Sequence, residues 1–177
     1  MKLFDDAAVG NGVLHIAEQI AASILSTASV EIVWLPCRSI NLSNMTVCEA
    51  PRGALEIHIL PEPLTTDSHE DTLGIALLHD PAGDRAAVFF SRAREVAATS
   101  AGGIEVAQVL GCAMAHEIGH LLLKSGTHSR EGVMRADFQT ADFRKAVRNE
   151  LTFTSAERDL IRKHRQAFSS SPPGQRL

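Results

Sequence analysis

An apolar run at residues 109–123, with three ionisable side chains embedded in it, requires a fold that can bury a helix. The run reads VLGCAMAHEIGHLLL, and its continuous apolar character over this length is typical of a buried helix. His116 and His120 are four residues apart, so on a helix their side chains lie on the same face. The two imidazoles therefore converge on one point, which can hold a zinc ion.

A zinc ion at this point needs a further ligand, because a catalytic zinc usually has three protein ligands and an open position for water. Glu117 has the position of a general base that reaches this water, so it is not expected to be the third ligand. The nearest candidate is His128. Lys124 and Gly126 are typical of a helix end, with a cation in the last turn and a glycine that can adopt φ > 0. A chain that turns back there can bring His128 to the metal.

The same stretch resembles a known family. It contains in order an HExxH motif, a glycine, a His-Ser pair at 128–129 and a methionine, Met134, that can lie beneath the site in a tight turn. This order resembles the metzincin zinc peptidases, most of all the matrix-metalloproteinase type, whose pattern is HExxHxxGxxH followed by a Met-turn. His128 lies eight residues after His120 rather than six. This longer loop is similar to that of a group of small bacterial metzincin-like proteins.

The resemblance covers about twenty residues and implies both a site and a fold. In the implied site, His116, His120 and His128 would hold one zinc ion, Glu117 would be the catalytic base, and Met134 would form the floor. The implied fold is α+β: a single metzincin-like catalytic domain over residues 1–168, with a twisted mixed β-sheet, an N-terminal helix, the active-site helix and a C-terminal helix. The length of 177 residues fits one domain, and residues 169–177 are expected to be a disordered tail.

Local patterns predict the elements that precede this stretch. Apolar residues spaced three and four apart predict a helix from Gly12 to about Ser29, and the β-branched residues 30–35 predict a strand that stops at Pro36. The polar, turn-rich residues 36–53 predict a long loop. Further along the chain, alternation predicts a half-buried strand at residues 55–60, and two strands that flank turn-forming residues predict an antiparallel hairpin, at residues 73–79 and 86–91.

Either strand of this hairpin is a candidate for the sheet edge that, in the metzincins, takes up an extended peptide as an additional strand. After the hairpin, residues 92–98 predict a short helical turn. Residues 136–149 predict a loop and a short helix, with Phe138 and Phe143 as anchors. Thr154 and Glu157 fit a capping box at the start of the C-terminal helix.

Composition restricts the partners and the compartment. The net charge is −4 with both signs interspersed, and no basic stripe indicates nucleic-acid binding. No apolar run reaches the roughly 18–20 residues that span a bilayer, so no membrane span is predicted, and a soluble monomer is the default. The first twelve residues lack the apolar core of a secretory signal, which predicts a cytoplasmic protein unless a leader has been removed.

The three cysteines form no CxxC pair, which disfavours a zinc ribbon. Free buried thiols are favoured for Cys37 and Cys48 over a disulfide, which would require export. Cys112, four residues before His116, is expected to pack in the core, because a thiolate ligand there would close the open position that catalysis requires.

The predicted function is that of a zinc-dependent endopeptidase acting on a peptide or protein. Two alternatives stay open. A gluzincin-type peptidase would take its third ligand from a downstream glutamate, Glu150 or Glu157. A zinc-stabilised binding module, or lapsed peptidase, would capture peptides without cutting them.

Overall fold

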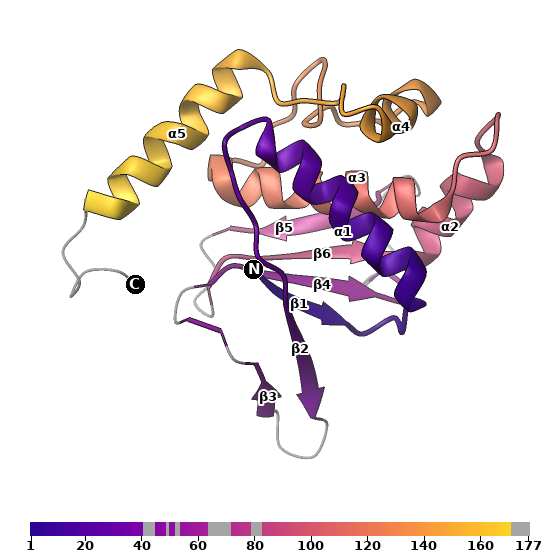
Figure 1. The fold of residues 1–177 in the computed structure, drawn as a ribbon, viewed down its shortest axis with the longest axis horizontal. Coiled ribbons are helices and arrows are strands. Elements are labelled where there is room, and N and C mark those ends of the chain that lie inside the picture. The colour runs from indigo at the N-terminus through magenta and orange to yellow at the C-terminus, as the bar shows by residue number, and fades with distance from the viewer. Residues whose placement is uncertain (41–44, 49, 52–53, 64–71, 79–82, 171–177) are drawn as a thin grey trace.

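The computed structural model describes residues 1–177 except 41–44, 49, 52–53, 64–71, 79–82 and 171–177. Among the described residues, six strands and one helix come first, and four helices follow from residue 90 onward (Figure 1). In chain order the elements are β1 (Lys2–Asp5), α1 (Asn11–Ser26), β2 (Leu35–Ile40), β3 (Met45–Val47), β4 (Glu56–Leu60), β5 (Gly74–Leu77), β6 (Arg85–Phe89), α2 (Phe90–Thr99), α3 (Val106–Leu123), α4 (Thr140–Val147) and α5 (Ser155–Ser170).

The strands form one sheet in the order β3-β2-β1-β4-β6-β5. The four inner strands run parallel, whereas β3 and β5 are antiparallel to their neighbours at the two edges. Parallel neighbours need a crossover connection, and α1 provides it between β1 and β2. Helices α1 and α3 pack against each other on one face of the sheet (Figure 1). A mixed sheet covered by helices confirms the predicted α+β class.

Helix α3 lies at the centre of the core because it is apolar on nearly all sides. Its residues Leu110, Met114 and Ile118 are fully buried, and Glu105 and Gln108 form a capping box at its N-terminus. By length and composition α3 could cross a membrane, but 83% of it is buried within the structure, and a buried core helix meets the same criteria. The absence of a membrane span stays a prediction.

The predicted strand at residues 30–35 and the predicted loop at residues 36–53 are wrong. β2 begins at Leu35, where the predicted strand ends, and β2 and β3 occupy much of the predicted loop. β1 pairs with both β2 and β4, yet its four residues have no counterpart among the predicted elements. The sheet therefore includes an N-terminal strand that the local sequence does not predict.

Pro36 lies inside β2 although proline lacks a backbone N–H. Successive residues of a strand turn their N–H groups to opposite sides, and Leu35 N donates to Met1 O on the β1 side. The nitrogen of Pro36 therefore faces the outer side of β2. There β3 pairs only with residues 38–40, so no hydrogen bond of the described sheet is lost.

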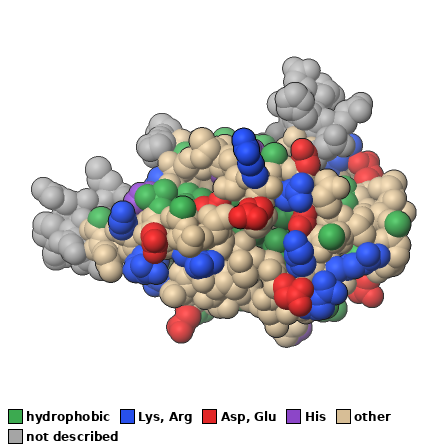
Figure 2. All heavy atoms as spheres, turned by 90° about the horizontal axis from the view of Figure 1, so that it is seen from above, with side chains coloured by type: hydrophobic (Ala, Val, Ile, Leu, Met, Phe, Trp, Pro, Cys, Tyr) green, Lys and Arg blue, Asp and Glu red, His purple; other side chains and the backbone are tan. Residues whose placement is uncertain are grey.

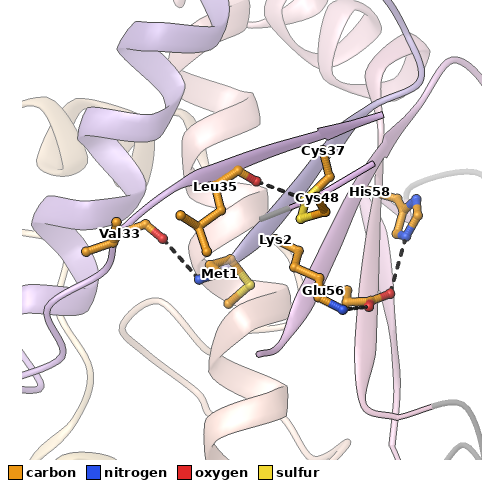
Figure 3. The surroundings of a disulfide bond; sticks show 8 residues. All are labelled: Met1, Lys2, Val33, Leu35, Cys37, Cys48, Glu56 and His58. Atoms are coloured by element: carbon orange, nitrogen blue, oxygen red, sulfur yellow. Dashed lines mark hydrogen bonds and ion pairs between the residues drawn. A yellow bond between two sulfur atoms is a disulfide. The ribbon is translucent and has the colours of Figure 1, made fainter. Parts of the chain in front are cut away.

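The prediction of free thiols at Cys37 and Cys48 is also wrong, because a disulfide joins them (Figure 3). β2 and β3 pair in the register Arg38↔Val47, so Cys37 and Cys48 form the next pair along the two strands. Their Cα atoms are 4.7 Å apart, a usual distance for a disulfide. The local sequence does not indicate this pairing, because its turn-rich residues predict a loop in place of the hairpin that creates it. Cys112 is a buried free thiol, in agreement with its predicted place in the core.

Strand β4 confirms the predicted alternation at residues 55–60. Ile57 and Ile59 are fully buried, while Glu56 and His58 are partly exposed on the opposite face. Lys2 and Glu56 form an ion pair of 2.6 Å between neighbouring strands (Figure 3). The predicted face of β4 is therefore correct.

The other helices and the hairpin lie close to their predicted limits. α1, α4 and the antiparallel pair β5–β6 are confirmed, and α2 has ten residues, more than the predicted turn. Thr154 and Glu157 make both hydrogen bonds of the capping box at the start of α5. α5 continues through Ser170 and so includes the first two residues of the predicted tail. Residues 171–177 lie outside the described part of the chain, as does His79 of the predicted hairpin.

Charged side chains on the surface are mixed in sign. On the face viewed in Figure 2, Lys and Arg side chains lie among Asp and Glu side chains. Some form exposed pairs three residues apart on helices, such as Arg92–Glu95 and Arg162–Asp159, and pairs of this kind contribute little to stability. The absence of nucleic-acid binding stays a prediction from composition.

Candidate metal centre

Three histidines from two parts of the chain meet at the C-terminal half of α3. His116 and His120 project from the helix, and His128 comes from the segment that follows it. One ring nitrogen of each lies within 4.8 Å of the other two, and the Nε2 atoms of His116 and His120 are 3.0 Å apart. The structure therefore brings together all three histidines that the sequence singled out, close enough to hold one metal ion.

Backbone carbonyls orient the two histidines of the helix. His116 Nδ1 lies 2.8 Å from Val133 O, and His120 Nδ1 lies 2.7 Å from Ser125 O. A carbonyl oxygen only accepts, so each Nδ1 carries a proton and donates it. In the neutral rings both Nε2 atoms then present lone pairs, which face each other across 3.0 Å. Two facing lone pairs repel each other, whereas a metal cation between the two nitrogens would be bound by both lone pairs.

The chain leaves α3 at Lys124 rather than at the predicted Gly126. Lys124 adopts the left-handed conformation with φ 51°, and its N–H closes the helix on His120 O. The reversal places Ser125 O beside His120 and returns the chain toward the other two histidines, so that His128 joins them. The predicted reversal of the chain is present, but Lys124 makes it, two residues before the glycine that was expected to do so.

A second turn places Met134 against α3. Gly132 in this turn has φ 76°, and Met134 is fully buried. A side-chain carbon added at Gly119 of α3 would overlap the sulfur of Met134. The turn also supplies Val133 O, which accepts the hydrogen bond from His116, so it supports the histidine cluster both by packing and by hydrogen bonding.

Burial keeps the two histidines of α3 neutral and makes Glu117 difficult to ionise. Burial, with a smaller contribution from the neighbouring histidines, lowers the pKa of His116 to about 4. Burial also lowers the pKa of His120. Neutral imidazole is the form that binds metals. Glu117 is 5% exposed, and burial raises its pKa to about 8. A carboxyl group whose pKa is displaced toward neutrality beside a cavity is typical of a catalytic acid or base.

The cluster opens into a cavity of about 750 Å³. Its walls come from β5, α2, α3 and the segment 136–143, and apolar side chains predominate among them. Besides Glu117 and the histidines, the other ionisable residue among the described lining residues is Asp137. Phe138 lies edge-on to the ring of His116, with ring centroids 5.7 Å apart. The size and lining of the cavity fit an organic ligand with apolar groups.

Strand β5 forms the sheet edge beside this cavity, and its backbone passes close to Glu117. A carbon added at Gly74 would lie 2.6 Å from Ala87 O of β6, 2.7 Å from Glu117 Cγ and 2.9 Å from Glu117 Oε1, so only glycine fits. Because Phe89 N donates to Leu73 O, alternate residues of β5 bond to β6. Gly74 and Ala76 consequently turn their N–H and C=O groups to the open edge.

Neither downstream glutamate considered as a third ligand lies in the histidine cluster. Glu150 is exposed and pairs with Arg148 at 3.1 Å. Glu157 is buried at the start of α5, where it accepts hydrogen bonds from Thr154 N and from Ser129 Oγ.

Some contributors to the site were not foreseen from the sequence. The carbonyls of Ser125 and Val133 have no sequence signature, because every residue carries a carbonyl. Phe138 was predicted only as an anchor of the fold, and its nearness to Met134 in the sequence is the one signal that places it at the site. The hydrogen bond from Ser129 to Glu157 joins residues 28 positions apart, so no local pattern indicates it.

Comparisons of the chain with protein-family models, with curated proteins and with solved structures found no match.

Proposed function

We propose that this chain is a zinc-dependent endopeptidase with a metzincin-like catalytic domain over residues 1–168. The observation that carries the proposal is the convergence of His116, His120 and His128, with their ring nitrogens within 4.8 Å of one another, beside the buried carboxyl group of Glu117. Three imidazoles with a cavity on the open side suit a catalytic zinc site, which keeps one position for water or substrate.

The metal ligands and Glu117 have different roles in the proposed hydrolysis. A zinc ion bound there would lower the pKa of water and polarise the carbonyl of the scissile bond. Glu117 follows His116 directly on α3 and faces the same cavity. When Glu117 is ionised, burial makes it a stronger base than an exposed carboxylate, so that carboxylate can accept a proton from the attacking water and pass it to the leaving amine.

The edge of β5 supports a peptide as the substrate. Gly74 and Ala76 turn backbone groups toward the cleft, and an extended peptide can pair with such an edge as an additional strand. Because Gly74 lies against Glu117, a peptide paired there would have its backbone close to the catalytic base. The apolar lining of the cavity would then accept an apolar side chain of that peptide.

The first test is metal content, measured by elemental analysis on wild type and His128→Ala purified side by side without added metal. We expect one zinc ion per chain in the wild type and its loss in the variant. His15→Ala is the matched control, because His15 is an exposed histidine on α1. Zinc retained in His128→Ala would move the third ligand to another residue. A wild type without metal would refute the proposed site.

The second test is cleavage of a mixed peptide pool by zinc-loaded protein. We expect cleavage that a chelator abolishes and that Glu117→Gln abolishes without removing zinc. The carboxylate is not needed as a ligand, and the amide that replaces it cannot act as a base. A pool left uncut by zinc-loaded wild type would favour the zinc-stabilised binding module.

A further inference from the structure

His128 is held differently from the other two histidines. His116 and His120 are buried on a rigid helix, and each donates to a backbone carbonyl. His128 is exposed and lies on an irregular segment, and within the described part of the chain neither of its ring nitrogens has a hydrogen-bond partner. A third ligand at a fixed position therefore requires that the backbone of this segment be fixed from elsewhere.

The residue that follows it, Ser129, provides two attachments. Ser129 N donates to Met134 O at 2.8 Å, which ties the segment to the turn beneath α3. Ser129 Oγ donates to Glu157 Oε1, which ties the same segment to the start of α5. The position of His128 thus depends on two parts of the chain that lie outside the histidine cluster.

Glu157 is built to hold this second attachment. It is 8% exposed, and its two carboxylate oxygens have separate partners: Oε1 accepts from Ser129, and Oε2 accepts from Thr154 N at 2.7 Å. A hydrogen bond to a carboxylate is stronger than one between neutral groups, and a buried carboxylate that loses a donor is left poorly satisfied. The link from α5 to the segment carrying His128 is therefore a rigid one.

We propose that Glu157 is a positioning residue for the metal site, which fixes His128 through Ser129 without itself touching the metal. This inference rests on the proposed three-histidine site. It gives α5 a specific role: the N-terminus of this helix holds the ligand that the active-site helix does not carry.

The test compares Ser129→Ala, Glu157→Ala and Thr154→Ala. Ser129→Ala removes only the hydroxyl that reaches Glu157. Thr154→Ala is the matched control, because it removes the side-chain oxygen that accepts from Glu157 N but keeps the backbone N–H that donates to Oε2. Zinc affinity is measured by competition with a chromophoric chelator, and the stability of each metal-free protein is measured by urea unfolding.

We expect Ser129→Ala and Glu157→Ala to weaken zinc binding by about 10- to 100-fold, the usual effect of losing an outer partner of a metal ligand. Thr154→Ala should lower stability through the lost cap and leave zinc affinity unchanged. Because both substitutions break one link, the double variant Ser129→Ala, Glu157→Ala should bind zinc no more weakly than Glu157→Ala alone. Cobalt(II) bound to Ser129→Ala should show an altered visible absorption spectrum, since the third nitrogen moves.

Three results would overturn the inference. Wild type that binds no zinc would remove the metal site itself and the inference with it. Zinc bound by wild type and equally by Ser129→Ala would refute the positioning role alone. Equal loss of affinity in Thr154→Ala and Ser129→Ala would show that the general stability of α5, and not the carboxylate link, supports the site.

Discussion

Replacing Gly119 with alanine should displace Met134 from its place against α3. Gly119 lies between Glu117 and His120 on the buried side of the helix. Its added methyl group would overlap the sulfur of Met134 and lie 3.0 Å from Phe153 Cε1. Met134 and Phe153 are both fully buried, so neither side chain has free space into which it can move.

Two opposing effects set the magnitude. Alanine is favoured over glycine inside a helix by about 1 kcal/mol, whereas forcing an extra methyl group into a filled core costs typically about 1–3 kcal/mol. Because the surroundings of Gly119 are fully packed, we expect the second effect to prevail. The net loss in free energy of unfolding should be up to about 2 kcal/mol, which for a chain of this length lowers Tm by up to about 8 °C.

The assay is urea unfolding of the four proteins of a double-mutant cycle, in chelator so that metal does not contribute. Met134→Ala alone should cost about 2–5 kcal/mol, since it leaves a cavity. In that background the methyl group of Gly119→Ala enters the space of the missing thioether. The same substitution should then be neutral or slightly stabilising, because only its helix preference remains.

This change of sign is what the overlap with Met134 requires. If Gly119→Ala destabilises equally in both backgrounds, the overlap is not the cause, and the packing of Met134 against Gly119 is refuted. If it is harmless in the wild type, Met134 is more mobile than a fully buried side chain should be. In either case, the packing of Met134 could not be what holds its turn in place, and the position of Val133 O, which accepts from His116, would need another explanation.

Three further predictions follow from the site and the sheet. Gly74→Ala should lower kcat/KM for peptide cleavage at least tenfold with zinc content unchanged, because the added carbon would overlap both Ala87 O of β6 and Glu117, and so displaces the β5 edge together with the carboxyl group; unchanged cleavage would contradict these contacts. In chelator, the stability of Glu117→Gln relative to wild type should rise by a few kcal/mol between pH 5 and pH 9. In the folded wild type Glu117 keeps its proton up to a pKa of about 8, whereas in the unfolded chain it releases the proton near pH 4.5, so the stability of the wild type declines as pH rises through this window. If urea unfolding at several pH values gives the same difference in stability between the two proteins, the buried carboxyl group is contradicted. Replacing Cys37 and Cys48 with serine should cost about 3 kcal/mol, since the bridge closes a short loop, and should leave zinc affinity unchanged because β3 and β5 are opposite edges of the sheet; weakened zinc binding would show that the two edges are coupled.

Elements whose local pattern also determines their packing could be predicted from the sequence. The continuous apolar character of α3 already specifies burial on all sides, and the alternation in β4 specifies its faces. The cluster of three histidines could be predicted from helical spacing and a chain reversal. The residue that makes the reversal was predicted incorrectly, since it is Lys124, yet His128 still reaches the other two histidines.

Elements defined by their partners could not be predicted. The residues 30–34 have strong strand preference, but no described strand pairs with them. β1 has only four residues and becomes a strand because β2 and β4 lie on either side of it. Pro36 suggested an end to pairing, whereas only its outer side lacks a partner. Pairing across the sheet is a tertiary property, which intrinsic preference does not encode.

Because β5 is short, few residues of another chain can pair with this edge of the sheet. An exposed strand edge is a template for other chains, so proteins keep such edges short, charged or covered. β5 has four residues, about 14 Å of strand at roughly 3.4 Å per residue, and only Gly74 and Ala76 turn their backbone groups outward. Two residues are too few to hold a neighbouring molecule in register for aggregation. They can still align one short stretch of peptide, so the same edge can serve recognition without becoming a seed for fibres.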